Sequence, residues 1–252
     1  MGNAFLPEIH PSKESYSQEP IDMTQKSSEE LILQLLKEKA SLKQDVFHKT
    51  ISAFNDMKKV IRGIADELRP KAAAIDQRLL VEFNDKSEFE VQLRVAGDVL
   101  IFHMHTNVFE FDTSHQIWKS SYVKETPSRS LCGMINVYNF LADSFKYNRS
   151  NDLGYLVARI FLNHENHYFV EGKRQLGFLY NDFANAVLDK NELGKIVESS
   201  IVYCLNFDLF TPPFEEMKVV SIAQTLEESS MMQLKTGKRL GFRFQADTDH
   251  PE

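Results

Sequence analysis

Hydrophobic residues recur every seven positions between Ser27 and Arg69. A second apolar set follows three residues after some members of this series, and no proline interrupts the segment before Pro70. Spacings of three, four and seven residues place side chains on one face of an α-helix. The pattern predicts an amphipathic helix about 63 Å long at roughly 1.5 Å per residue. Its apolar stripe consists of Leu33, Leu36, Ala40, Phe47, Phe54, Met57, Ile61, Ile64 and Leu68.

Local signals mark both ends of this helix. Ser27 and Glu30 have the spacing of a capping box, in which each side chain accepts a hydrogen bond from the backbone amide of the other residue. At the other end, Pro70 has no amide hydrogen to donate. We therefore expect Pro70 to stop the helix, or to kink it into a shorter helix over 71–78.

The length of this helix predicts self-association. The remaining residues would form a body only about 40 Å across, so a straight helix would extend beyond it and expose apolar surface. The stripe is wider than a two-stranded seam because Ile32 and Val46 are also apolar, and its flanks carry no repeating charge pairs of a parallel zipper. We expect one part to pack on the chain's own sheet and another on a second copy; a helix packed wholly within one chain is the alternative. The residues assigned to oligomerisation are Leu33, Leu36, Phe47, Phe54, Met57, Ile61 and Ile64.

Alternation of polar and apolar residues replaces the helical pattern after Leu79. The segment 88–95 alternates regularly, which predicts a half-buried strand. Gly97 and Asp98 then suggest a two-residue hairpin turn. In that register Leu93 would lie opposite Phe102 on the apolar face, and Glu90 opposite His105 on the polar face.

The same two patterns predict the remaining elements. Strands are expected at 117–123, 131–141, 155–162 and 167–171, with a turn at 163–166 and a bulge near Asn107 that precedes strand-like residues 107–112. Helices are expected at 181–188, 192–205 and 214–228, and a closing hairpin strand within 232–244. Because strands and helices are segregated, the predicted fold class is α+β: a long N-terminal amphipathic helix, an antiparallel meander-like sheet, C-terminal helices and a closing hairpin strand. The expected organisation is a flexible tail at 1–26, the helix at 27–70, an α+β domain at 71–246 and a frayed C-terminus at 247–252.

Composition narrows the possible partners. The net charge of −7 argues against a general affinity for nucleic acid or anionic lipid. Cys132 and Cys204 lie in separate apolar stretches and form no CxxC pair, so we expect buried thiols in a reducing compartment. The N-terminus lacks the features of a secretory signal, and no apolar run is long enough to span a membrane. A cytoplasmic protein is therefore expected.

One histidine pattern suggests a metal site. His103 and His105 share a strand face, and Glu90 is the expected cross-strand neighbour of His105. Two imidazoles and a carboxylate could hold zinc or iron, although a solvated His–Glu contact is the simpler interpretation. His164 and His167 flank Glu165 and are expected to be polar turn residues.

Two other groups of residues suggest binding. The C-terminal segment combines cations with phenylalanines, which would suit phosphate or nucleic acid, or simply protect a sheet edge; its cations are Lys235, Lys238, Arg239 and Arg243. Polar residues within two apolar strands could line a small-molecule pocket or be ordinary sheet polars; they are Asn136, Tyr138, Asn139 and Arg159. Dinucleotide, P-loop and GxSxG motifs are all missing from the sequence.

The sequence thus predicts a non-enzymatic binding or scaffold protein. It would self-associate through its N-terminal helix and present a sheet surface or pocket to an unidentified protein or small molecule. No cofactor, membrane or nucleic-acid partner is expected. The alternatives are a zinc or iron enzyme at the first hairpin, and a phosphate- or nucleic-acid-binding protein at the C-terminal hairpin.

Overall fold

The computed structural model describes residues 27–150, 152–173 and 175–207, together with positions 214, 218, 219, 221 and 222. The chain divides into two compact units between Ser41 and Leu42. In the first unit, α1 (Ser28–Leu35) is followed by a π-helical turn, η1 (Leu36–Ala40). The predicted tail, 214–228 helix and closing hairpin lie largely or wholly outside the described residues.

The capping box at the start of α1 is confirmed. Ser27 Oγ accepts a hydrogen bond from Glu30 N at 3.2 Å, and Glu30 Oε2 accepts one from Ser27 N at 3.0 Å. Two of the four amides that a helix start leaves without partners are thereby satisfied. Glu29 and Glu30 also place negative charge where the helix dipole favours it.

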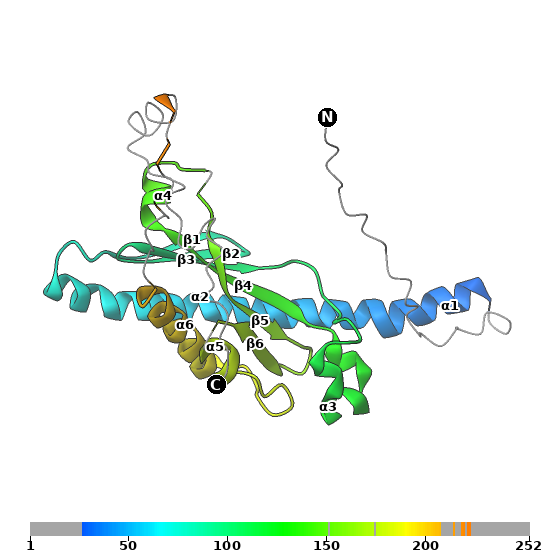
Figure 1. The fold of residues 1–252 in the computed structure, drawn as a ribbon. Helices are drawn as coiled ribbons and strands as arrows, with labels where there is room; N and C mark the ends of the chain where they lie inside the picture. Colours follow the sequence, from blue (N-terminus) through cyan, green and yellow to red (C-terminus); the bar gives the residue numbers. More distant parts are fainter. Residues whose placement is uncertain are drawn as a thin grey trace, which may run out of the picture. The chain divides into compact units, whose positions relative to one another are not determined.

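The second unit is built on a six-stranded antiparallel sheet in which each strand pairs with its neighbours in sequence (Figure 1). This meander confirms the predicted α+β class. The strands are β1 (Val81–Ser87), β2 (Glu90–Val95), β3 (Asp98–Met104), β4 (Gly133–Leu141), β5 (Tyr155–Leu162) and β6 (Tyr168–Gly172).

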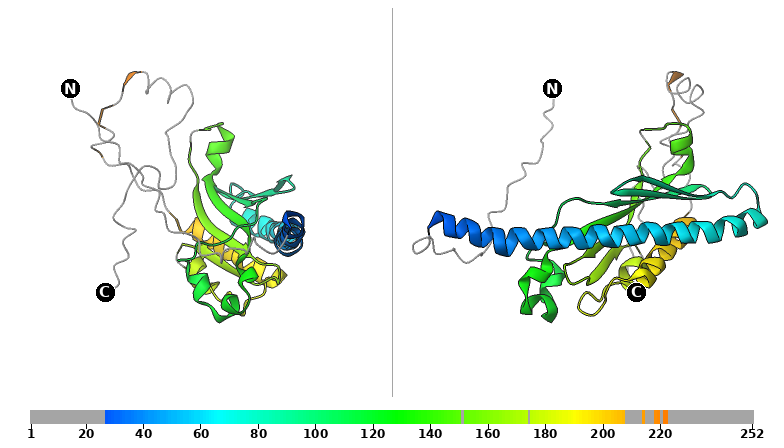
Figure 2. Two further views of the ribbon diagram at one scale, coloured as in Figure 1. Left: turned by 90° about the vertical axis from the view of Figure 1, so that its right-hand side faces the viewer. Right: turned by 180° about the vertical axis from the view of Figure 1, so that it is seen from behind.

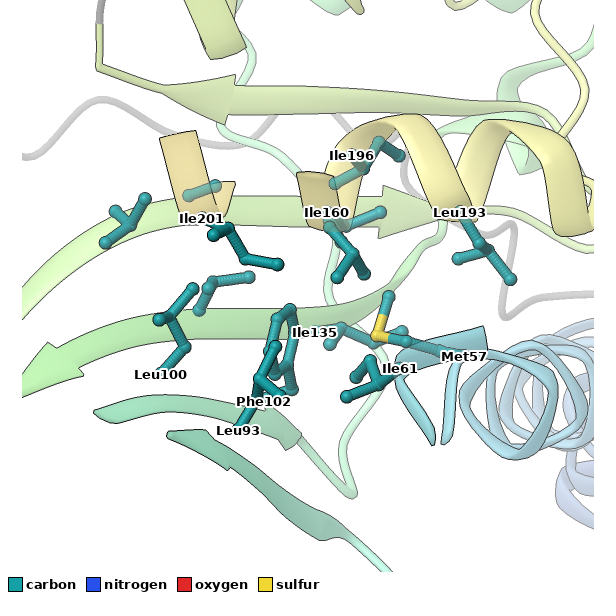
Figure 3. Packing of buried hydrophobic residues seen from close by; sticks show 14 of the residues in the cluster. Met57, Ile61, Leu93, Leu100, Phe102, Ile135, Ile160, Leu193, Ile196 and Ile201 are labelled. Carbon is teal, nitrogen blue, oxygen red and sulfur yellow. The ribbon is translucent and has the colours of Figure 1, made fainter. Parts of the chain in front are cut away.

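Two helices cover one face of this sheet. The helix α2 (Ser41–Ile75) runs across the strands (Figures 1 and 2), and α6 (Lys190–Leu205) packs beside it. Apolar side chains of both helices and of the strands point toward one another in a shared core (Figure 3). Burial of this apolar surface is the main driving force for folding. The fully buried large side chains of this core include Phe54, Met57, Ile61, Leu93, Leu100, Phe102, Ile135 and Ile160.

The helix continues past the position where we expected it to stop. Pro70 lies inside α2, which ends at Ile75, so no separate helix over 71–78 forms. Proline removes one backbone hydrogen bond from the ladder. Packing of Leu68 and Ala72 against the core, on either side of Pro70, holds the helix together there.

The hairpin register is displaced by two residues from the prediction. Leu93 lies opposite Leu100, and Glu90 lies opposite His103 rather than His105. The turn is formed by Ala96 and Gly97, with Ala96 in the left-handed region at φ 52°. A shift of two residues keeps every side chain on its predicted face, because strand side chains alternate with a period of two.

Three further predictions are corrected. Residues 117–123 form no strand; they belong to the short helices η2 (Gln116–Lys119) and α3 (Ser121–Glu125), with η3 (Pro127–Ser130) following. Residues 181–188 form no helix; a loop takes their place. Strand-like residues 107–112 are reduced to an isolated bridge at Phe109, and strand β1 was not predicted. Two short helices, α4 (Ala142–Lys146) and α5 (Gln175–Leu179), complete the described elements.

Other parts of the chain form hydrogen bonds with backbone groups at both edges of the sheet. Along β1, Lys58 Nζ donates to Ser87 O at 2.5 Å and Arg69 Nε donates to Val81 O at 3.0 Å. The other edge strand, β6, forms backbone hydrogen bonds with the loop at 180–187. Backbone groups bonded in this way are not available to pair with strands of other molecules. We therefore do not assign partner binding to strand addition.

Candidate ligand-binding cleft

The second face of the sheet differs from the helix-covered face because polar side chains alternate into it from β1 and β2. One end is covered by a second hydrophobic cluster, in which the segment 109–125 packs on Phe161 and Phe169. Over β1, β2 and β3 this face opens into a cleft of about 740 Å³. That volume lies within the range of small-molecule sites.

The lining of this cleft is strongly basic. Four of its residues are cations contributed by four different elements: Arg69, Lys86, Arg94 and Lys146. Among the described residues that line it, Glu82 is the single carboxylate. The chain as a whole carries a net charge of −7, so the charge of the cleft is opposite in sign to that of the whole chain. A concave surface lined by one sign of charge concentrates ligands of the opposite sign.

The sheet fixes Arg94 in position. Arg94 lies directly opposite Glu82 in the pairing of β1 with β2, and its Nη1 donates to Glu82 Oε2 at 3.2 Å. Its Nε donates to Ala96 O at 3.2 Å, so the turn also holds the guanidinium. A planar group with five donors keeps others for a ligand when two are used in this way.

Arg69 reaches the cleft from α2. Its Nε is bound to Val81 O, and its Nη1 donates to Asp66 Oδ1 at 3.0 Å. These two contacts orient the side chain along the edge strand. Lys86 lies on the edge strand β1, is exposed, and makes no hydrogen bond or ion pair with any described residue. It is therefore available to a bound anion.

Lys146 contributes the fourth cation from α4. A hydrogen bond from its ammonium group to the Tyr147 side chain raises the pKa of Lys146, and the charge of Arg94 opposes this rise. A raised lysine pKa keeps the group protonated throughout the neutral range. Arg94 and Lys146 both line the cleft, so both face a ligand bound there.

An aromatic wall borders the cleft beside Lys146. Phe145 is exposed over 44% of its surface and lies edge-on to Phe140, with ring centroids 5.7 Å apart. Phe140 in turn packs on Gly154, where a Cβ atom would approach the ring to 2.5 Å. The exposed Phe145 ring offers an apolar surface next to the cations, which suits a ligand with both charged and planar parts.

The residues of the predicted metal site do not form a cluster. Glu90 and His103 are cross-strand neighbours, but Glu90 accepts from Gln92 Nε2 at 2.9 Å. His105 lies beyond the end of β3, where its Nδ1 accepts from Asn107 N. Within the ranges that the structure describes, no three His, Cys, Asp or Glu side chains are grouped as metal ligands would be.

The second histidine cluster surrounds a buried tyrosine that the sequence did not indicate. Tyr122 OH donates to Glu165 Oε2 at 2.5 Å and accepts from Asn163 Nδ2 at 2.9 Å. His167 stacks on the same ring, and Arg129 lies over it at 4.2 Å. These contacts attach the predicted turn at 163–166 to α3 and η3, and we assign them a structural role.

The four predicted pocket residues are divided between the two faces. Asn139 is buried, and its Nδ2 donates to Asp98 Oδ1 at 2.9 Å and to Tyr155 OH at 3.1 Å. Arg159 lies on the opposite face, where it donates to Glu171. None of these residues lines the cleft.

Glu171 also contacts His115, a histidine that no sequence motif indicates. His115 Nε2 lies 3.3 Å from Glu171 Oε1, while His115 Nδ1 accepts from Ile117 N at the start of η2. Both ring nitrogens are thus engaged within the fold. We assign His115 to anchoring η2 rather than to proton transfer, because neither nitrogen is left for a substrate.

Sequence patterns could not have identified the cleft, because its cations are isolated residues in separate elements. The predicted basic group at Lys235, Lys238, Arg239 and Arg243 lies outside the described residues. Of the predicted oligomerisation residues, Phe54, Met57 and Ile61 are buried in the core of their own chain, whereas Leu33 and Leu36 are exposed.

No family model, curated protein or solved structure matches this chain. Among the described helices, none combines the length and the apolar character needed to cross a membrane.

Proposed function

We propose that this protein is a non-enzymatic binding module whose cleft over β1, β2 and β3 takes an anionic small molecule. The observation that supports this proposal is the placement of four cations and one carboxylate around a cleft of about 740 Å³. Arg69 and Arg94 are held in place before any ligand binds. Preorganised donors bind more tightly because less conformational freedom is lost on association.

Isothermal titration calorimetry with inorganic tripolyphosphate tests this proposal. Wild-type protein is expected to bind at low salt and to bind more weakly as salt rises, because screening acts on exposed charges. The double variant Arg94→Gln/Lys146→Gln is expected to lose about tenfold in affinity, which corresponds to two exposed ion pairs of roughly 0.7 kcal/mol each.

A matched control is the double variant Lys190→Gln/Lys195→Gln on α6, which removes two exposed cations, paired with Asp56 and Glu192, away from the cleft. Its affinity should equal that of the wild type. Absence of tripolyphosphate binding by the wild type would overturn the proposal. An equal loss in the control would also do so, since binding would then reflect net charge alone.

A second candidate function is self-association through α1 and η1, which the exposed apolar residues of this segment support. Ile32, Leu33, Leu35 and Leu36 are all exposed, and neither element contains a buried residue. Clusters of exposed apolar residues mark interaction sites in soluble proteins. We propose a second copy of the chain as the partner.

Light scattering on the full chain tests self-association. Leu36→Asp is expected to shift the protein to monomer, whereas Ile75→Asp, at a comparably exposed apolar position on α2, should leave the mass unchanged. A monomeric wild type at every concentration would contradict this function. A reducing compartment such as the cytoplasm fits both functions, since Cys132 and Cys204 are buried and form no disulfide.

A further inference from the structure

The charges that flank the apolar residues of α1 are arranged asymmetrically along the helix. Glu29 and Glu30 lie in its first turn, and Lys37 and Lys39 lie in η1. Glu30 and Lys37 are seven residues apart, so they occupy equivalent positions on the same flank of the exposed stripe. One end of this flank is acidic and the other is basic.

The direction in which two such helices pack decides which charges meet. In an antiparallel pair, the same flank of both copies meets, with the two helices running in opposite directions. Glu30 of each copy then lies beside Lys37 of the other copy, so symmetry gives two such contacts. In a parallel pair, this flank of one copy meets the opposite flank of the other copy. Each residue on it then lies beside the residue five positions earlier in the other copy, so Lys37 lies beside Ile32. Only the antiparallel arrangement pairs opposite charges.

We propose that α1 and η1 form an antiparallel helix pair with the same segment of a second copy, held in register by reciprocal Glu30–Lys37 contacts around Leu33 and Leu36. This inference rests on the self-association proposed above and specifies its geometry. One carboxylate oxygen of Glu30 serves the capping box, and the other remains for the second copy.

The size of the segment predicts a weak dimer. It offers four exposed large apolar side chains per copy, fewer than a standard interface contains. The dimer should therefore dissociate on dilution and also weaken at high salt, since the flanking contacts are exposed charges. Both dependences can be followed by sedimentation velocity across a dilution series.

Charge reversal tests the register. Lys37→Glu makes the flank wholly acidic and Glu30→Lys makes it wholly basic, so each single variant should dissociate at higher concentration than the wild type by roughly tenfold. The double variant Glu30→Lys/Lys37→Glu restores both contacts with reversed polarity and should recover most of the lost association. Glu30→Gln controls for the capping box, because glutamine can also accept from the Ser27 amide.

Chemical crosslinking tests the orientation. Ser28 and Lys39 are separated by about 17 Å along the helix, at 1.5 Å per residue, and by about three turns, so they lie on the same side of it. In the antiparallel pair with Glu30 beside Lys37, Ser28 of each copy lies level with Lys39 of the other copy. A mixture of Ser28→Cys and Lys39→Cys proteins should therefore crosslink with a short bismaleimide, whereas Ser28→Cys alone should not. Cys132 and Cys204 are buried and should not compete.

The outcomes separate this inference from the proposed self-association. A monomeric wild type contradicts both. A dimer in which Ser28→Cys alone crosslinks is parallel and contradicts only the antiparallel geometry. A dimer whose dissociation is unchanged by either charge reversal contradicts the Glu30–Lys37 register. Loss in both single variants, recovery in the double variant and crosslinking only in the mixture support the inference.

Discussion

Arg94 and Glu82 face each other across the first two strands of the sheet and form the one ion pair within the lining of the cleft, among the residues that the structure describes. The side chain of Glu82 is 57% exposed, so its carboxylate remains hydrated. This pair holds Arg94 over the cleft while neutralising part of its charge. The affinity of the cleft for an anion should therefore depend on the charge of Glu82.

Replacing Glu82 with glutamine should strengthen anion binding. Glu82→Gln removes the negative charge nearest Arg94 but keeps a side-chain oxygen that can accept its hydrogen bond. We expect tripolyphosphate affinity to rise by about two- to fivefold at low salt, and stability to change by less than about 1 kcal/mol because the pair is exposed. Calorimetry and urea unfolding measure the two effects, and weaker binding would contradict our account of the cleft.

Gly133 should not tolerate a side chain. A Cβ atom at Gly133 would lie 2.0 Å from Thr50 Oγ1, which donates to Val46 O inside the helix–sheet interface. Gly133→Ala is therefore expected to destabilise the protein by about 1–3 kcal/mol, the usual cost of overpacking. Thr50→Ala in the same chain should recover part of this loss by removing two of the three clashing atoms. Equal stability of Gly133→Ala and wild type would show that α2 moves freely on β4.

Met57 should contribute strongly to stability. It is fully buried between α2 and the sheet, so Met57→Ala leaves a cavity and should cost about 2–5 kcal/mol. Ile75→Ala at the exposed end of the same helix should change stability by no more than about 0.5 kcal/mol. Urea unfolding of the two variants measures the difference. Similar values would mean that the α2–sheet core does not form as described.

Tyr122→Phe should reduce stability in a pH-dependent way. The hydroxyl donates to Glu165, and this bond is the largest cause that lowers the pKa of Glu165 below its ordinary value of 4.5. A lowered folded-state pKa contributes stability that is present above the unfolded pKa and is lost as pH falls through the folded one. We expect a loss of about 1.5–3 kcal/mol at neutral pH. The difference from wild type should shrink below about pH 4.5, and a constant difference down to acid pH would contradict this role of Glu165.

The same hydrogen bond acts on the tyrosine at high pH. Burial, the largest cause, and the Glu165 contact together raise the pKa of Tyr122 to about 12. A raised folded-state pKa contributes stability that is lost as pH rises from the unfolded value of 10.0 toward 12. Wild type should therefore lose more stability than Tyr122→Phe over this range, as denaturation in alkaline buffers can measure.

Local patterns predicted the elements with strong periodicity. The capping box at Ser27, the strand at 155–162 and the helix at 192–205 all appear in the structure, because capping and side-chain periodicity within each segment indicate them. The errors fall where the pattern is short. Residues 117–123 mix apolar and polar positions in a way that suits either a strand or two helical turns, and packing on the second hydrophobic cluster decides between them.

The candidate site was much harder to predict than the fold. The alternation of side chains predicted that Glu90 and His103 share one face of the hairpin, and they do. The turn begins one residue earlier than predicted, however, so His105 lies beyond the end of β3. The cleft itself depends on Arg69 and Lys146, which lie in α2 and α4 and have no sequence relationship. Single cations of this kind resemble ordinary surface residues until the fold brings them together.

The sequence alone determined which face the hairpin of β2 and β3 buries, where the first helix begins and that strands and helices are segregated. These properties depend on side-chain alternation, helical periodicity and local capping, which act over a few residues. Tertiary structure decided the strand register, the continuation of α2 through Pro70 and the convergence of four cations over three strands. Such features depend on contacts between distant segments, whose energies are set only once the core of α2, α6 and the sheet has formed.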